Sequence, residues 1–265
     1  MSLLVKARRD GREIVNVTPR SAGWKYVGFA AYRLSAGDSV TVQKPDDELC
    51  IIVLAGKVTV KHGSETWRDI GERSDVFEDR APYAVYLPAG DEVVVTAHTR
   101  AEIGVASAPA ANAPLPARLI EPSAMKRFAR GTGLNERFVC DILPQTEPAT
   151  HLLVVEVRTP SGHSSSYPPH KHDSDNLPHE SALEETYYHR LQPAQGFAFQ
   201  RVYTDDRSLD ESLAVEDHDV VLVPRGYHPV VVPFGYESYY LNVMAGPKRE
   251  WHFKNDPAHE WMLQR

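Results

Sequence analysis

Apolar residues along the chain mostly alternate with polar ones or form short runs rich in Val, Ile and Leu. Four such segments lie at Lys57–His62, Glu92–Thr96, Leu152–Arg158 and Asp219–Val223. Alternation with a period of two, bounded by turn residues, is typical of half-buried β-strands, and helical periodicity is scarce. Many short strands separated by turns indicate an all-β sandwich or barrel.

One stretch interrupts this pattern and divides the chain. Residues 106–117 carry no charge and contain three prolines. Such a composition favours an extended linker. We therefore expect an N-terminal half at 1–105 and a C-terminal half at 118–265.

The two halves share an order of features. Glu48 opens an apolar run, and Gly90 follows it 42 positions later in a Leu-Pro-Ala-Gly turn. Glu185 opens a second run, and Gly226 follows it 41 positions later in a Val-Pro-Arg-Gly turn. Self-similarity of this kind indicates a duplicated unit, although Pro-x-Gly turns are common in β proteins.

The C-terminal half carries candidate metal ligands. His170 and His172 are two positions apart and would point to one side of a strand, and Glu185 and His228 lie at spacings that allow convergence. Three imidazoles and one carboxylate suit Zn, Mn, Fe(II), Co or Ni, so we expect one divalent ion, zinc or manganese by preference. The alternative is surface polarity, since the chain has twelve histidines. Glu184 is the alternative carboxylate.

These residues resemble the metal site of the cupins. A narrower resemblance, to the 5-deoxy-glucuronate isomerase family, covers nearly the whole chain. It rests on the segments 166–173 (SYPPHKHD), 183–188 (LEETYY), 223–229 (VPRGYHP), 130–133 (RGTG) and 246–251 (GPKREW). The match departs from simple cupins in a longer loop between His172 and Glu185, and in the single residue between Gly226 and His228.

The resemblance implies a fold and an activity. The fold is two tandem cupin domains, each a jelly-roll-like β-barrel. The activity is metal-dependent aldose–ketose isomerisation of 5-deoxy-glucuronate to 5-dehydro-2-deoxy-gluconate in myo-inositol catabolism. In the N-terminal half, Glu48 stands at the ligand-like position, residues 42–44 offer no histidine pair, and Glu92 replaces the last histidine. We expect that half to bind no metal.

Candidate catalytic residues follow from the strand period. Tyr187 and His189 share the face of Glu185, and Glu184 is a third candidate base. The alternative for the first two is that they fill the barrel. A cation should hold the sugar carboxylate, and Arg225 and Arg249 are the nearest candidates, with a solvated surface charge as the alternative reading.

Composition narrows the remaining function classes. The 29 basic and 36 acidic residues give a net charge of −7, which argues against a nucleic-acid partner. The two cysteines, Cys50 and Cys140, do not form a CxxC pair, and we expect them to be reduced and buried. We expect a cytoplasmic enzyme with no membrane partner, because no leader-like or long apolar segment is present. A homo-oligomer is left open.

Two rival functions use the same residues. An Fe(II) cupin dioxygenase would need the same four ligands, and a non-enzymatic sugar-binding cupin would need only the pocket. The segment 130–133 (RGTG) predicts a turn rather than a phosphate-binding loop, because it lacks a third spaced glycine and a Lys-Ser/Thr pair.

Overall fold

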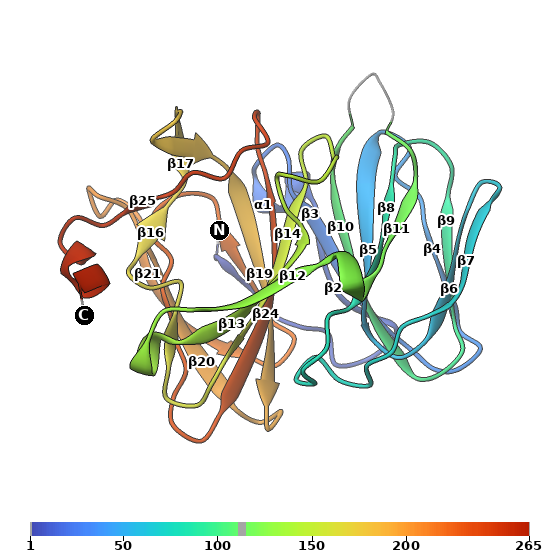
Figure 1. Ribbon diagram of the computed structural model, residues 1–265, viewed down its shortest axis with the longest axis horizontal. Helices are drawn as coiled ribbons and strands as arrows, with labels where there is room; N and C mark the ends of the chain where they lie inside the picture. Colours follow the sequence, from blue (N-terminus) through green and yellow to red (C-terminus); the bar gives the residue numbers. More distant parts are fainter. Residues whose placement is uncertain (1, 111–114, 265) are drawn as a thin grey trace.

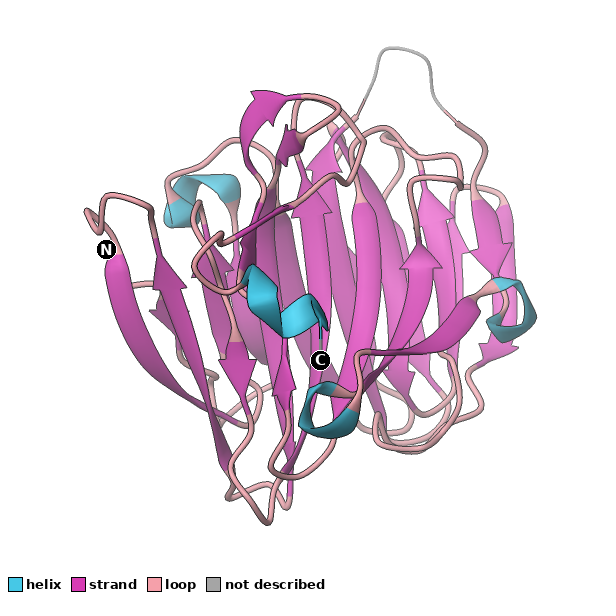
Figure 2. Ribbon diagram, turned by 60° about the vertical axis from the view of Figure 1, so that its left-hand side comes forward, coloured by secondary structure: helices cyan, strands magenta, loops and turns pink. Residues whose placement is uncertain are grey.

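The computed structural model describes residues 2–110 and 115–264, and these are organised almost entirely as strands (Figures 1 and 2). Besides the strands, they form one short α-helix, α1 (Pro19–Ala22), and three short 3-10 helices. The expected all-β class is therefore confirmed. The four clearest segments of the sequence form β6 (Val58–His62), β9 (Val93–Ala97), β14 (Leu153–Thr159) and β22 (Val220–Val223).

Two sheets form the barrel built from the first part of the chain, which we call the N-terminal barrel. The six-stranded sheet has the order β11-β8-β5-β10-β3-β2, and the four-stranded sheet has the order β4-β9-β6-β7. The further strands are β2 (Glu13–Val17), β3 (Gly28–Leu34), β4 (Ser39–Val42), β5 (Asp47–Ala55), β7 (Glu65–Ile70), β8 (Tyr83–Leu87), β10 (Ala101–Pro109) and β11 (Arg118–Ile120).

A seven-stranded and a four-stranded sheet form the C-terminal barrel. Their orders are β1-β22-β19-β24-β14-β13-β12 and β15-β23-β20-β21. These strands are β1 (Leu4–Val5), β12 (Lys126–Arg130), β13 (Arg137–Leu143), β15 (Ser164–Ser165), β19 (Glu184–Gln192), β20 (Phe197–Tyr203), β21 (Asp210–Glu216), β23 (Val230–Val231) and β24 (Glu237–Ala245). Two small two-stranded sheets complete the half: β16 (His170–Lys171) with β25 (Lys254–Asn255), and the hairpin of β17 (Asp173–Asn176) with β18 (Glu180–Ala182).

Alternation along the central strands sorts side chains between two cores. In β5, Ile51 and Val53 belong to the core inside the N-terminal barrel. Ile52 and Leu54 belong to the larger core that continues into the C-terminal half. Both faces of β5 are buried, which explains why its sequence is an almost unbroken apolar run.

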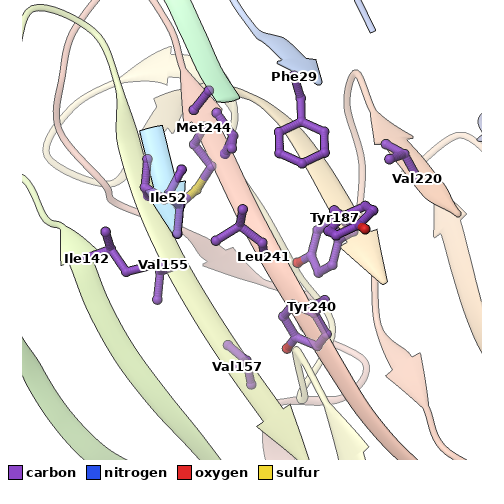
Figure 3. Packing of buried hydrophobic residues seen from close by; sticks show 14 of the residues in the cluster. Phe29, Ile52, Ile142, Val155, Val157, Tyr187, Val220, Tyr240, Leu241 and Met244 are labelled. Carbon is purple, nitrogen blue, oxygen red and sulfur yellow. The ribbon is translucent and has the colours of Figure 1, made fainter. Parts of the chain in front are cut away.

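The large sheets of the two barrels pack on each other through this second core. Figure 3 shows Phe29 and Ile52 near Leu241 and Met244 of β24, and all four are at most 1% exposed. A buried ion pair crosses the same boundary, because Arg73 donates from Nη1 and Nη2 to Glu156 at 2.9 and 2.8 Å. The halves are thus joined by one continuous apolar interface with a paired charge inside it.

Three segments lie outside the part of the structure to which the sequence assigns them. Residues 106–109, expected in the linker, are the end of β10, which is central in its sheet. Arg118–Ile120, assigned to the C-terminal half, pairs with β8 of the N-terminal barrel. Leu4–Val5 pairs with β22 of the C-terminal barrel. Positions 111–114 of the expected linker lie outside the described residues.

Two smaller expectations can be compared with the structure. Cys50 in β5 and Cys140 in β13 are free and buried, as predicted. Among the described helices, none has the length and apolar character needed to cross a membrane.

Candidate metal centre

Three imidazoles and one carboxylate meet inside the C-terminal barrel. His170 lies in β16, His172 follows that strand, Glu185 lies near the start of β19, and His228 lies between β22 and β23. Ligand nitrogens of the three histidines lie within 4.8 Å of one another. Glu185 Oε2 is 3.0 Å from His172 Nε2 and 3.2 Å from His228 Nε2. The structure therefore brings all four predicted ligands together.

Backbone carbonyls fix the orientation of two of these rings. His172 Nδ1 lies 3.1 Å from the Leu183 carbonyl, and His228 Nδ1 lies 2.9 Å from that of Gly226. Because a carbonyl only accepts, each neutral ring carries its proton on Nδ1 and turns the lone pair of Nε2 toward Glu185.

This arrangement places lone pairs against a carboxylate. His228 Nε2 is fully buried and makes no hydrogen bond with the described residues. Nitrogen lone pairs facing a carboxylate oxygen at about 3 Å need a cation among them, and a divalent metal has the right charge and ligand preference. The donor set therefore fits a metal ion.

The ionisation of Glu185 and His170 agrees with this role. Burial alone would raise the pKa of Glu185, but the close approach and charge of His172 and His228 outweigh it and lower that pKa to about 2. Burial alone would lower the pKa of His172, but the nearby Glu185 carboxylate raises it. Burial, followed by repulsion from His228 and His172, lowers the pKa of His170 well below its usual value. An ionised carboxylate and a neutral imidazole are the ligand forms of these side chains.

The turn that carries His228 is held from outside the site. Asp173 Oδ2 accepts the Gly226 amide at 2.7 Å. Gly226 has φ +89°, and a Cβ there would lie 2.5 Å from the Tyr203 carbonyl oxygen. Only glycine fits this close approach. The Pro-x-Gly turn seen in the sequence therefore fixes the position of His228.

A narrow cavity adjoins the candidate ligands. Its lining residues are Arg130, Arg137, Val139, Val155, Val157, Ser166, His170, Glu185, Tyr187, Tyr240, Asn242 and Trp251. The rings of Tyr187 and Tyr240 pack with their centroids 4.9 Å apart (Figure 3). The Tyr187 hydroxyl forms a hydrogen bond with Ser166 at 3.0 Å, and that of Tyr240 forms one with Ser165 at 2.8 Å. Burial and then the charge of Glu185 raise the pKa of Tyr187 well above its usual value, so its hydroxyl stays protonated.

The other two candidate bases lie elsewhere. His189 is fully buried and does not line the cavity, and its ring stacks on that of Tyr187 with the centroids 6.0 Å apart. Its Nε2 lies 3.0 Å from Gln200 Oε1, and burial lowers its pKa to about 4. Glu184 faces the other barrel, where it accepts backbone amides of residues 25–27. Of the three, Tyr187 alone lines the cavity.

The predicted carboxylate-binding arginines are also placed outside it. Arg225 is exposed and is not among the cavity-lining residues. Arg249 donates to five backbone carbonyls, those of Leu143, Pro144, Gln145, Glu147 and Leu152. Sequence reasoning missed Arg130 and Arg137, which do line the cavity. In the sequence, the segment 130–133 carries part of the family resemblance and predicts a turn, but it does not indicate a binding role for Arg130.

The correspondence between the halves is shifted by one residue from the sequence prediction. Leu49 pairs with Leu87 in the N-terminal barrel, as Glu185 pairs with Val223 in the C-terminal barrel. Each partner begins its Pro-x-Gly turn. Leu49, which has no ligand atom, is therefore the counterpart of Glu185, and the assignment of Glu48 to the ligand-like position is wrong.

Comparisons with known proteins cover nearly the whole chain. A family model described as the KduI/IolB family matches residues 3–262. A protein of Geobacillus kaustophilus named 5-deoxy-glucuronate isomerase is 56% identical over 251 residues, which cover 95% of this chain and 91% of the relative. A protein of Bacillus subtilis with the same name is 51% identical over 258 residues, 97% of this chain and 95% of the relative.

Solved structures agree on the fold. The crystal structure of an IolB-like protein from Salmonella typhimurium has a TM-score of 0.97 and 48% identity, and the match covers 99% of this chain and all of that one. The oxalate decarboxylase of Lactobacillus farciminis, solved as a formate complex, has a TM-score of 0.68 and 13% identity, covering 100% and 91% of the two chains. That second likeness concerns the fold alone.

Proposed function

The chain belongs to the KduI/IolB family, and we propose on that premise that it is a 5-deoxy-glucuronate isomerase of myo-inositol catabolism. It converts the aldose acid 5-deoxy-glucuronate to the ketose acid 5-dehydro-2-deoxy-gluconate. The observation that carries the proposal is identity above 50% to proteins of that name over more than nine tenths of the chain. The reaction has no net redox change, so it needs no nicotinamide or flavin.

One divalent ion, zinc or manganese, belongs to this proposal. His170, His172, Glu185 and His228 would hold it, because a ring nitrogen of each histidine and the ionised carboxylate converge. Such an ion supplies Lewis-acid polarisation of a carbonyl and orients the substrate.

The residues of the chain supply the remaining chemistry. Tyr187 presents a protonated hydroxyl to the cavity, and Ser166 orients it at 3.0 Å. We assign this hydroxyl to a hydrogen bond with a substrate oxygen that gains negative charge as the C2 proton leaves. Val139, Val155 and Val157 make one wall apolar, which excludes water from the enediol.

The test is an assay of the metal-loaded protein with 5-deoxy-glucuronate in deuterated water without oxygen. We expect a ketose product with deuterium at C1 and loss of turnover with a chelator. An unchanged aldose together with oxygen uptake on another substrate and an Fe(II) requirement would establish the dioxygenase. Binding of sugar without any turnover would establish the non-enzymatic cupin.

The setting of the enzyme is also part of the proposal. We place it in the cytoplasm with a small carboxylated sugar as its partner and without nucleic acid or membrane. Free, buried Cys50 and Cys140 suit a reducing compartment. Light scattering of the purified chain measures whether it forms a homo-oligomer.

A further inference from the structure

Two arginines stand directly opposite each other at one side of the candidate site. Arg130 ends β12, Arg137 begins β13, and the two are partners in the antiparallel register of that hairpin. Directly opposed residues project to the same face. Both line the cavity that His170 and Glu185 also line.

Neither guanidinium contacts a carboxylate directly within the described residues, although the charge of Arg130 acts on Asp141. Arg137 is only 6% exposed, yet its contacts are neutral: the Asn135 carbonyl and Oδ1 at 2.9 and 3.1 Å, and the Tyr167 carbonyl at 3.2 Å. Arg130 lies over the Phe253 ring at 5.1 Å. Within residues 2–110 and 115–264, neither arginine forms an ion pair with a carboxylate.

Another buried arginine of the chain shows the contrast. Arg73, 3% exposed, forms a two-pronged pair with Glu156. A buried charge without a partner is costly, and like charges directly opposed across a hairpin are destabilising. Burial and then the charge of Arg130 lower the pKa of Arg137, which is the mark of that cost. An anion between the two guanidinium groups would remove it.

We propose that Arg130 and Arg137 bind the carboxylate of the sugar acid. This inference rests on the proposed function, because it names the part of the substrate that the site recognises. A forked guanidinium matches the two oxygens of a carboxylate.

The turn between β12 and β13 leaves space for the guanidinium of Arg137. Gly131 has φ +82°, and a Cβ at this position would lie 2.7 Å from Arg137 Nη1. A side chain there would displace the guanidinium as well as strain the backbone. The segment 130–133 thus gains a role that its sequence did not reveal.

A third polar group of this cavity is a buried amide. Asn242, in β24, is 3% exposed, and its side chain acts on the Tyr187 hydroxyl, but its Nδ2 forms no hydrogen bond of good geometry with the described residues. A buried amide donor left in this way costs free energy unless a ligand accepts from it. It independently indicates that the cavity takes a ligand with oxygen acceptors.

The experiment compares binding of glucuronate and of glucose to the metal-loaded full chain by calorimetry. We expect the wild type to prefer the carboxylated sugar by about ten- to a hundredfold, the usual range for one charge-assisted hydrogen bond. Arg137→Met should remove most of that preference, Arg130→Met should reduce it, and Arg137→Lys should keep part of it. Arg127→Met is the matched control, since Arg127 lies on the same strand but pairs with Asp79. It should leave the preference unchanged.

Thermal unfolding and metal content show whether each variant is folded. If Arg137→Met does not fold, the binding measurement on Arg130→Met is the deciding test, because Arg130 is partly exposed. Folded variants that keep the full preference, or a wild type without any preference, would overturn the carboxylate site. A preference that depends on these arginines in a protein that leaves 5-deoxy-glucuronate unconverted would refute the isomerase and keep the site. If the protein converts 5-deoxy-glucuronate but its preference for the carboxylated sugar does not depend on these arginines, the isomerase is kept and the carboxylate site is refuted.

Discussion

Glu48 and Glu184 make the same contact in opposite directions across the boundary between the barrels. The carboxylate of Glu48 accepts the backbone amides of residues 150–152 at 2.6–2.7 Å. That of Glu184 accepts the amides of residues 25–27 at 2.7–3.0 Å. Each glutamate opens the central strand of one barrel and holds the segment that leads into a strand of the other. The pair is a stabilising feature of the duplication and lies outside the metal centre.

The first prediction concerns these two carboxylates. Glu48→Gln and Glu184→Gln should each lower the free energy of unfolding by about 1.5–3 kcal/mol, because an amide nitrogen would face a backbone N–H that now has a charged acceptor. Urea unfolding measures the loss. The exposed Glu65→Gln is the control and should change stability by less than about 0.5 kcal/mol. Equal stability in all three variants would contradict the assigned contacts.

The second prediction concerns metal content. Elemental analysis should find about one divalent ion per chain in the wild type, and much less in His170→Ala/His172→Ala and in Glu185→Gln. Glu184→Gln is a sharp control, because it removes the neighbouring carboxylate, which faces the other barrel. If Glu184→Gln loses the ion and Glu185→Gln keeps it, the ligand assignment is reversed.

A third prediction concerns the hydroxyl in the cavity. Tyr187→Phe should lower kcat by about a hundredfold, as loss of a hydrogen bond to developing negative charge does, with metal content unchanged. Tyr188→Phe removes the hydroxyl of the adjacent residue, which donates to Glu102 on the opposite face of the strand, and should leave kcat near the wild-type value. Steady-state kinetics with 5-deoxy-glucuronate provide the measurement. Similar kcat values for the two variants would remove Tyr187 from the mechanism.

The fourth prediction is a pH dependence of stability away from the site. Burial alone would lower the pKa of His218, but contacts with Asp217 and Glu102 raise it, against repulsion from Arg190. The protonated ring therefore stabilises the fold fully below its unfolded pKa of about 6.5. That contribution is lost as pH rises through the raised folded pKa.

Unfolding curves measured at several pH values test this sign. Wild-type stability should fall as pH rises above about 6.5, more steeply than that of His218→Asn. Asparagine is a suitable replacement because position 218 has φ +73°, a region that asparagine tolerates. Parallel pH profiles for the two proteins would show that His218 has no such role.

The alternation of apolar residues was enough to predict the fold class, because each strand buries at least one face in a barrel. The sequence matched Glu48 with Glu185, one residue away from its true counterpart. The reason is that two glutamates stand side by side in the C-terminal half and only one stands at the matching place in the N-terminal half. Yet Gly226 follows Glu184 by 42 positions, the same separation as Gly90 from Glu48. That equality was visible in the sequence and identifies Glu184 as the counterpart of Glu48.

The arginines that line the cavity could not be predicted from the sequence. Nearness along the chain to His228 and to the last shared motif favoured Arg225 and Arg249. The structure instead uses Arg249 to satisfy carbonyls of an irregular loop, a need that no sequence pattern reports. Arg137 enters the cavity only because a hairpin pairs it with Arg130 and the barrel then closes around both.

The pairing of Leu4–Val5 with β22 has a consequence for how the protein is made on the ribosome. At about 5–20 residues per second, the first strand waits roughly 10–40 s until its partner at Val220–Val223 has been synthesised. A chain that stops before that point lacks the strand that receives its N-terminal segment, and it lacks His228 as well. Incomplete products therefore keep an unpaired N-terminal segment, which is a template for pairing with other chains until Val220–Val223 has been made.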